Sequence, residues 1–284
     1  MKSLLIFASG CYNKSRKKYI VMEPVITKYP ILLVHGLVLK KFLFFRPFGR
    51  IDKVLKKKGF VVYLSHNDGF GTIEGNASLI KEDILKILQI ENCEKVNIIA
   101  HSKGGLDAKY MIQHLDMENH VASLTTLCTP HKGSPIATNI LRLPKWILKF
   151  IAFWINLWYI LFGDKHPDAL TVCHQLAESN DIEEETFFSS HKVYCQSYST
   201  KMEKARNDFV MGIPFKFFHY FEKDKECDGL VSKESAIFGE YKGNAFNESI
   251  SHAQITGFFA KKKKKEKVYA FYTELCTDLA KRGF

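Results

Sequence analysis

The sequence predicts an α/β fold in which helices flank a central, mainly parallel sheet. Short apolar runs alternate with amphipathic segments along the chain. One of these runs ends in a tight turn of small residues, and a hydrophobic fraction of 46% over 284 residues is enough to fill a large core. Because strands and helices alternate, the sheet is expected to be parallel.

The expected elements follow the chain in order. Strands are expected at 31–35, 60–64, 96–100, 121–127 and 192–197, with one more before His252. Helices are expected at 46–58, 76–89, 103–115, 169–178 and 266–280. We expect a tail over residues 1–27 and one domain over 28–284, with an insert at about 136–165.

The turn after the third expected strand contains the first candidate site residue. The residues Ala-His-Ser-Lys-Gly-Gly occupy positions 100–105, directly after an apolar run. A serine at a sharp strand-to-helix turn is typical of a nucleophile elbow, which needs small residues two before and two after it. Ala100 and Gly104 meet this requirement, with alanine in place of the usual first glycine. Ser102 is the candidate nucleophile.

Two residues further along complete a catalytic set in the order Ser, Asp, His. Asp228 lies in a turn, and His252 lies where a strand passes into a helix. His252 would take the proton of Ser102 and return it to the leaving group, while Asp228 would orient the imidazole. Chain order and local context favour this pair over the nearby acids and the other downstream histidines, which are Asp224, Glu226, His191 and His219.

An oxyanion site needs two backbone N–H groups. Lys103, the residue after the candidate nucleophile, is expected to supply one. Leu37 is expected to supply the other, because Gly36 before it lets the backbone approach closely. The Lys103 side chain is expected to face solvent or the cleft, and His101 is expected to be a packing residue.

Five segments in order carry a resemblance to a known family. They are the strand 29–37, the segment 100–110, the loop 128–134 with its Pro-His-Lys-Gly-Ser motif, the turn 228–231 and the pair Ser251–His252. Together they resemble the bacterial triacylglycerol lipase and esterase family of α/β-hydrolases. The resemblance implies the α/β-hydrolase fold and serine-dependent hydrolysis of lipid-like carboxylic esters.

The resemblance also bears on metal binding. Several lipases similar to this chain hold a structural calcium ion with a carboxylate two positions after the catalytic histidine. That position is Gln254 here, so we expect no calcium site, although Asp168 and other acids could contribute to one. The cysteines and histidines lack a zinc-type spacing. We expect neither a metal nor a cofactor.

Residues 146–162 are apolar on almost every side. A transmembrane helix here would put Ser102 and Asp228 on opposite sides of a bilayer, and its length of about 26 Å is short for a span. A buried core helix is a second interpretation. We favour a mobile lid, which is what lipases similar to this chain insert here, and we expect the protein in water to hide its apolar surface. At a lipid interface the lid would bury Trp146, Phe150, Trp154 and Trp158.

Charge and cysteine content limit the partners and the location. The net charge is +11, partly from the lysines at 261–265 and 267, which we interpret as a solvated face with attraction to anionic lipid as the alternative. No nucleic-acid recognition motif accompanies them, so nucleic acid is not an expected partner. Seven irregularly spaced cysteines and a short apolar stretch at 4–8 favour reduced thiols and a cytoplasmic location. Small residues before Cys11 leave a secreted or lipid-anchored form open.

Three alternative functions stay open. A phospholipase or lysophospholipase, and a thioesterase or acyltransferase, would use the same serine, acid and histidine. An inactive module that binds lipid surfaces would need none of the three. The oligomeric state and the acyl chain length also stay open.

Overall fold

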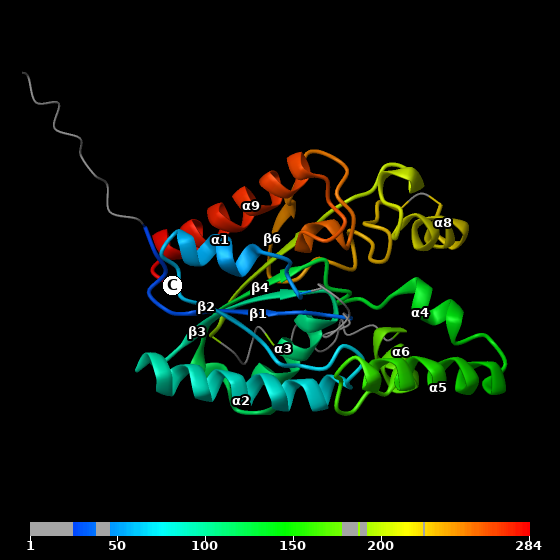
Figure 1. The fold of residues 1–284 in the computed structure, drawn as a ribbon, viewed down its shortest axis with the longest axis horizontal. Coiled ribbons are helices and arrows are strands. Elements are labelled where there is room, and N and C mark those ends of the chain that lie inside the picture. Colours follow the sequence, from blue (N-terminus) through cyan, green and yellow to red (C-terminus); the bar gives the residue numbers. More distant parts are fainter. Residues whose placement is uncertain (1–24, 38–45, 178–186, 188–191, 224) are drawn as a thin grey trace, which may run out of the picture.

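The computed structural model describes residues 25–37, 46–177, 187, 192–223 and 225–284. Within these residues, six parallel strands form one sheet in the order β2-β1-β3-β4-β5-β6 (Figure 1). The strands are β1 (Ile31–Val34), β2 (Val62–Leu64), β3 (Val96–His101), β4 (Val121–Leu127), β5 (Tyr194–Ser199) and β6 (Glu240–Asn244). The predicted parallel sheet is confirmed, and each predicted strand range overlaps an observed one.

Helices cover both faces of the sheet (Figure 1). On one face lie α1 (Ile51–Lys57) and α9 (Lys262–Lys281), and on the other lie α2 (Ile73–Glu91) and α3 (Lys103–His114). Alternate residues of each strand point to opposite faces. In β1, Ile31 and Leu33 therefore join the core under α1 and α9, whereas Leu32 and Val34 join the core under α2 and α3.

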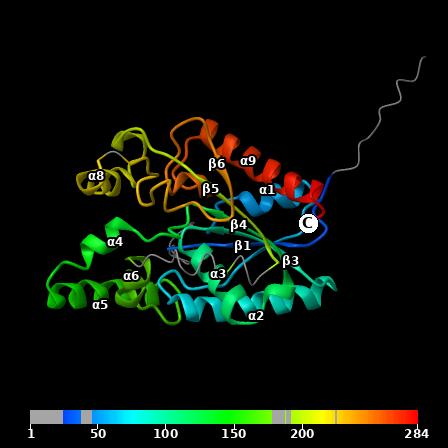
Figure 2. The same ribbon diagram turned by 180° about the vertical axis from the view of Figure 1, so that it is seen from behind.

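A second group of helices lies at the carboxyl end of the sheet. It consists of α4 (Pro135–Ile140), α5 (Lys145–Leu161), α6 (Ala169–Ala177) and α8 (Gly212–Phe221). Figures 1 and 2 both show these helices at the end of the molecule opposite the C-terminus. The short helix α4 packs against both α6 and α8. The sequence predicted α6 and the apolar insert that contains α5, but it did not predict α8.

Some sequence predictions fall outside the described residues. They concern Cys11 and most of the N-terminal tail, and the rival residues Asp224 and His191. The cytoplasmic location therefore stays a prediction. Among the described cysteines, all six are free thiols. No helix in the described part of the chain combines the length and the apolar character that a membrane span requires.

Candidate active site

Ser102 lies at the carboxyl end of the central strand β3, between His101 and the first residue of α3. Its backbone has φ 56° and ψ −135°, which is a strained conformation for a residue with a side chain. Neighbouring glycines make room for this turn. A Cβ on Gly36 would lie 2.7 Å from the Ser102 Cβ, and a Cβ on Gly104 would lie 2.6 Å from the His35 carbonyl oxygen. The predicted sharp turn of small residues therefore has a steric cause.

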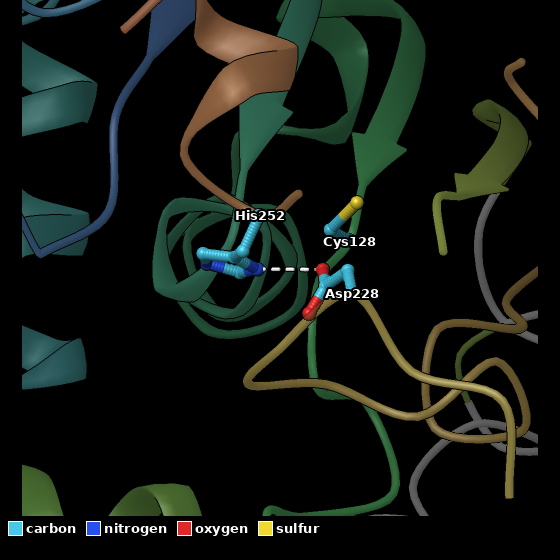
Figure 3. Close-up of side chains that lie close together, drawn as sticks. All are labelled: Cys128, Asp228 and His252. Atoms are coloured by element: carbon cyan, nitrogen blue, oxygen red, sulfur yellow. Dashed lines mark hydrogen bonds and ion pairs between the residues drawn. The ribbon is translucent and has the colours of Figure 1, made fainter. Parts of the chain in front are cut away.

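Ser102, His252 and Asp228 form one chain of hydrogen bonds. The Ser102 Oγ lies 2.8 Å from His252 Nε2, and His252 Nδ1 lies 2.7 Å from Asp228 Oδ2. Figure 3 shows the second contact as a dashed line. All three side chains are buried, so solvent screens their contacts only weakly. The structure brings together the three residues that the sequence singled out, from elements far apart in the chain.

The Asp228 carboxylate is held in a fixed orientation. Its Oδ1 accepts backbone hydrogen bonds from Leu230 at 2.9 Å and from Val231 at 2.8 Å, which leaves Oδ2 for His252. The backbone N–H of His252 also donates to the Asp228 carbonyl at 2.9 Å. Glu226, a rival acid, is exposed and pairs with Lys201 and Lys233 instead.

Two residues outside the predicted catalytic set, His101 and Thr129, support the hydrogen-bonded series of Ser102, His252 and Asp228. The His101 ring donates from Nε2 to the His252 carbonyl at 3.0 Å, and the two rings lie 4.6 Å apart. Burial, with the nearby His252 as a smaller cause, lowers the pKa of His101 well below its usual value, so the ring is neutral at pH 7. The Thr129 hydroxyl donates to the Ser102 carbonyl at 2.8 Å. No sequence signal identifies Thr129, because the contact depends on how β4 and the turn meet.

Leu37 and Lys103 were the predicted oxyanion donors. Leu37 lines the same cavity as Ser102 and His252. A Cβ on Gly36 would lie 3.0 Å from the Lys103 backbone nitrogen, so the two loops approach as closely as the prediction required. Among the described residues, neither backbone N–H donates to a backbone carbonyl.

The prediction for the Lys103 side chain is wrong. It is completely buried, and its Nζ lies 2.7 Å from Asp107 Oδ1, one helical turn along α3. Burial raises the pKa of Asp107 to about 6, although the Lys103 ammonium and the Asn76 amide lower it in part. The sequence did carry a signal, since a lysine and an aspartate four residues apart share one face of a helix.

Cys128 lies beside the Asp228–His252 pair (Figure 3). The thiol, a carboxylate oxygen and a ring nitrogen lie within 4.8 Å of one another, which is a spacing that could suit a metal ion. Each atom already has a partner, because the Cys128 Sγ lies 3.4 Å from the Thr200 hydroxyl. Burial, reinforced by the Asp228 charge, raises the pKa of Cys128 and keeps the thiol protonated. We therefore interpret this group as part of the hydrogen-bonded site.

The calcium position implied by the resemblance does not suit a divalent cation here. Gln254 Oε1 accepts a hydrogen bond from the Lys264 ammonium at 3.1 Å, and the same ammonium donates to the Ser249 carbonyl at 2.6 Å. A lysine of this chain thus provides the positive charge at that position. Asp168 is occupied elsewhere, because it accepts from the Thr171 backbone and hydroxyl at the start of α6. The sequence predicts a solvated face for the lysine run. Lys264 departs from this prediction, because its ammonium contacts Ser249 and Gln254.

An apolar cavity of about 230 Å³ opens beside Ser102 and His252. It lies between the carboxyl end of the sheet and the helices α4, α5 and α6. Helix α5 contributes Leu148, Ile151, Ala152 and Ile155, which share its inner face. A group bound at Ser102 therefore extends into a space lined almost entirely by hydrocarbon.

The prediction that the protein hides the apolar surface of α5 is wrong for the outer face of this helix. Only Leu148 and Ala152 of its residues are buried. The four residues predicted to reach a lipid interface all lie outward, with exposures of 72% for Trp146, 62% for Phe150, 46% for Trp154 and 52% for Trp158. The exposure of these side chains also excludes the interpretation of this segment as a buried core helix, because a core helix has few exposed apolar side chains.

Comparison with known proteins places this chain among lipases. Residues 64–157 match the model of a family described as a PGAP1-like alpha/beta domain. Over 264 residues the chain is 30% identical to triacylglycerol lipase 2 of Saccharomyces cerevisiae, which covers 82% of this chain and 73% of the yeast protein. This chain belongs to the triacylglycerol lipase family. A triacylglycerol lipase of Pseudarthrobacter phenanthrenivorans is 31% identical over 163 residues, or 53% of this chain and 50% of that protein.

Solved structures show the same fold. Lipase 1 from Pelosinus fermentans superposes with a TM-score of 0.63 and 14% identity, and the match covers 90% of this chain and 99% of that chain. The α/β-hydrolase fold expected from the sequence is confirmed, and this member of the triacylglycerol lipase family is a carboxylic ester hydrolase.

Proposed function

We propose that the chain hydrolyses carboxylic esters of lipid-like substrates, with Ser102, His252 and Asp228 as its catalytic triad. The observation that carries the proposal is the hydrogen-bonded chain from Asp228 to Ser102, which ends at the wall of an apolar cavity. A serine becomes a nucleophile when an adjacent base takes its proton, and the base is most effective when a third group orients it.

The reaction follows from these contacts. The Ser102 Oγ attacks the ester carbonyl while His252 Nε2 takes its proton, and Asp228 stabilises the imidazolium through Nδ1. The backbone N–H groups of Leu37 and Lys103 donate to the oxyanion. His252 then returns the proton to the leaving alcohol. In the second half, His252 removes a proton from water, the resulting hydroxide attacks the acyl ester, and Ser102 regains its proton.

The cavity supports medium to long acyl chains as substrates. Its lining is aliphatic, and helix α5 forms one wall of it. Ser102 is buried, and helix α5, which buries only two of its own residues, forms one wall of the cavity beside it. We propose that α5 is a lid whose displacement at a lipid surface opens the cavity, so activity rises once substrate exceeds its solubility.

Hydrolysis of p-nitrophenyl esters from acetate to palmitate, with and without detergent micelles, tests the proposal. Ser102→Ala should lower kcat by about 10⁴-fold or more, because the remaining groups of a triad cannot supply a nucleophile. Ser134→Ala is the matched control, since Ser134 lines the same cavity but does not contact His252, and it should keep most of the activity. Equal activity in Ser102→Ala and wild type would overturn the assignment.

The choice of substrate separates the alternative functions. A preference for octanoate and longer esters with micelles supports a lipase with a moving lid, whereas a preference for acetate without a micelle effect indicates an esterase with a static cap. Faster cleavage of phosphatidylcholine or of a thioester would identify those substrates as preferred. Lipid binding without cleavage of any ester would identify a binding module.

A further inference from the structure

Helix α8 and the turn before it expose an apolar surface that the proposed chemistry does not use. Phe209 is 98% exposed, Ile213 78% and Tyr220 75%, and Phe217 and Phe221 are exposed beside them. Soluble proteins rarely expose so many large apolar side chains in one place, and such patches mark interaction sites. We refer to residues 204–221 as the α8 surface.

The exposure results from the sequence pattern of the helix. Phe215 and Phe218 point inward and pack on Met202 and Cys227, which fixes the orientation of the helix. Ile213, Phe217 and Tyr220 recur at helical spacing on the opposite side. The aromatic content of α8 therefore exceeds what its core contact uses, and the excess faces outward.

The charge on the α8 surface is positive. Lys204, Arg206 and Lys216 are exposed and line a groove of about 990 Å³ together with Phe209 and Ile213. In the described part of the chain, none of these three cations pairs with a carboxylate. The one carboxylate between residues 204 and 221 is Asp208. It is buried and accepts hydrogen bonds from Val210, Met211 and Ser251.

Helix α8 packs against a helix that lines the cavity. Helix α4 packs against α8 through Ile136, and Ile136 and Ile140 also line the cavity beside Ser102. Both views of the ribbon show α8 at the same end of the molecule as α5 (Figures 1 and 2).

We propose that the α8 surface docks the protein onto anionic phospholipid membranes. Aromatic and aliphatic side chains enter the acyl boundary while nearby cations meet phosphate and carboxylate headgroups, as in interfacial helices generally. A second copy of the chain fits poorly, because a two-fold contact would bring the positively charged α8 surface of one copy against the same positively charged surface of its partner. The inference extends the proposed function but does not depend on which residue attacks the ester.

Vesicle binding by the full chain tests the inference. The Ser102→Ala variant is used as the background so that no lipid is consumed, and vesicles of phosphatidylcholine alone are compared with vesicles that also contain phosphatidylserine. Each basic residue near an anionic surface raises partitioning about fivefold. The triple variant Lys204→Gln, Arg206→Gln, Lys216→Gln should therefore lose about 100-fold in affinity for the anionic vesicles. Ile213→Ser with Tyr220→Ser should weaken binding to both kinds of vesicle.

Two control variants remove the same number of cations, or the same number of exposed apolar residues, elsewhere. Lys261→Gln, Lys262→Gln and Lys263→Gln take three exposed cations from the lysine run, and Leu85→Ser with Ile90→Ser take two exposed aliphatic residues from α2. Both should bind as the background does. In the wild-type background, unchanged hydrolysis of p-nitrophenyl acetate shows that each variant is folded.

Two results would overturn the inference. One is equal loss of anionic-vesicle binding in the lysine-run variant and in the α8 variant. The other is a dimer in solution that Ile213→Ser with Tyr220→Ser dissociates, since this would identify a second copy as the occupant. Absence of ester hydrolysis with vesicle binding intact would refute the proposed function and leave the docking surface standing.

Discussion

The candidate catalytic residues and helix α5 differ in how extensively the rest of the protein contacts them. Ser102, His252 and Asp228 are buried and joined by direct hydrogen bonds. Helix α5 buries only two of its residues, and α6 is the helix it contacts most. Acyl transfer needs reacting groups in a fixed geometry, whereas entry of a bulky substrate needs an element that moves at low cost. Under the proposed function, the catalytic residues would meet the first requirement and α5 the second.

The two ends of α5 also differ in how firmly they are anchored to the rest of the protein. After its carboxyl end, the Asp68 carboxylate accepts from the backbones of Lys165 and His166 at 2.9 Å, and the Asp164 carboxylate accepts from the Phe70 backbone at 2.8 Å. Residues 142–144, before its amino end, are exposed. A displacement of α5 would therefore pivot about the anchored carboxyl end and move the amino end furthest.

Apart from loss of the nucleophile itself, the largest effect expected among the catalytic residues comes from Asp228→Asn. Leu230 and Val231 donate to Oδ1, so the asparagine would keep its carbonyl oxygen there and turn its NH₂ group toward His252. The imidazole would then carry its proton on Nε2, facing Ser102, and could not act as a base. We expect kcat to fall about 10⁴-fold with little change in stability.

Steady-state kinetics and thermal melting check this expectation together. Glu226→Gln is the matched control, because Glu226 is an exposed acid two residues away that pairs with Lys201 and Lys233, and it should retain full activity. A comparable loss in both variants would argue that charge in this turn, and not orientation of His252, supports catalysis.

The Lys103–Asp107 pair separates support of the fold from chemistry. Lys103→Met leaves a buried carboxylate without its cation and should lower the free energy of unfolding by about 3–5 kcal/mol at pH 7. The backbone N–H of residue 103 is unchanged, so kcat per folded molecule should stay the same. Chemical denaturation and active-site titration measure the two quantities separately.

The pH dependence of this loss has a definite sign. Asp107 in the folded protein has a pKa of about 6, above its ordinary value, so the folded state holds this proton more tightly than the unfolded state. Its contribution to stability is therefore present at low pH and is lost as the pH rises through about 6. Without Lys103 this pKa rises further, so the deficit of Lys103→Met should shrink toward pH 5. The double variant with Asp107→Asn should lose this dependence, and a deficit independent of pH would contradict the argument.

A feature of the structure could be predicted from the sequence where local sequence determines it, and could not where contacts between distant segments determine it. The strand ranges and the three candidate catalytic residues depend on local patterns, namely apolar runs, small residues in a turn and chain order, and β4 was predicted without error. Contacts of Thr129 and Cys128 depend on how separate strands meet, which no local pattern encodes. Helix α8 was missed because its aromatic run contains a proline and a glycine at its start, which favour a turn. The exposure of α5 could not be predicted, since a helix that is apolar all round is normally buried.

Substitutions on the inner and outer faces of α5 should have the smallest effects, and they test whether α5 forms the wall of the acyl site. Ala152 is buried and lines the cavity, so Ala152→Phe should fill space that a long acyl chain needs. We expect kcat/KM for p-nitrophenyl palmitate to fall about tenfold while that for the acetate stays near wild type, because only the longer chain reaches residue 152. Trp146→Ser, on the exposed face, should leave both soluble esters unaffected and lower the rate only on emulsified substrate. If Ala152→Phe lowered the rate equally for every chain length, the cavity under α5 would not be the acyl site, and the helix would act on catalysis through the fold alone.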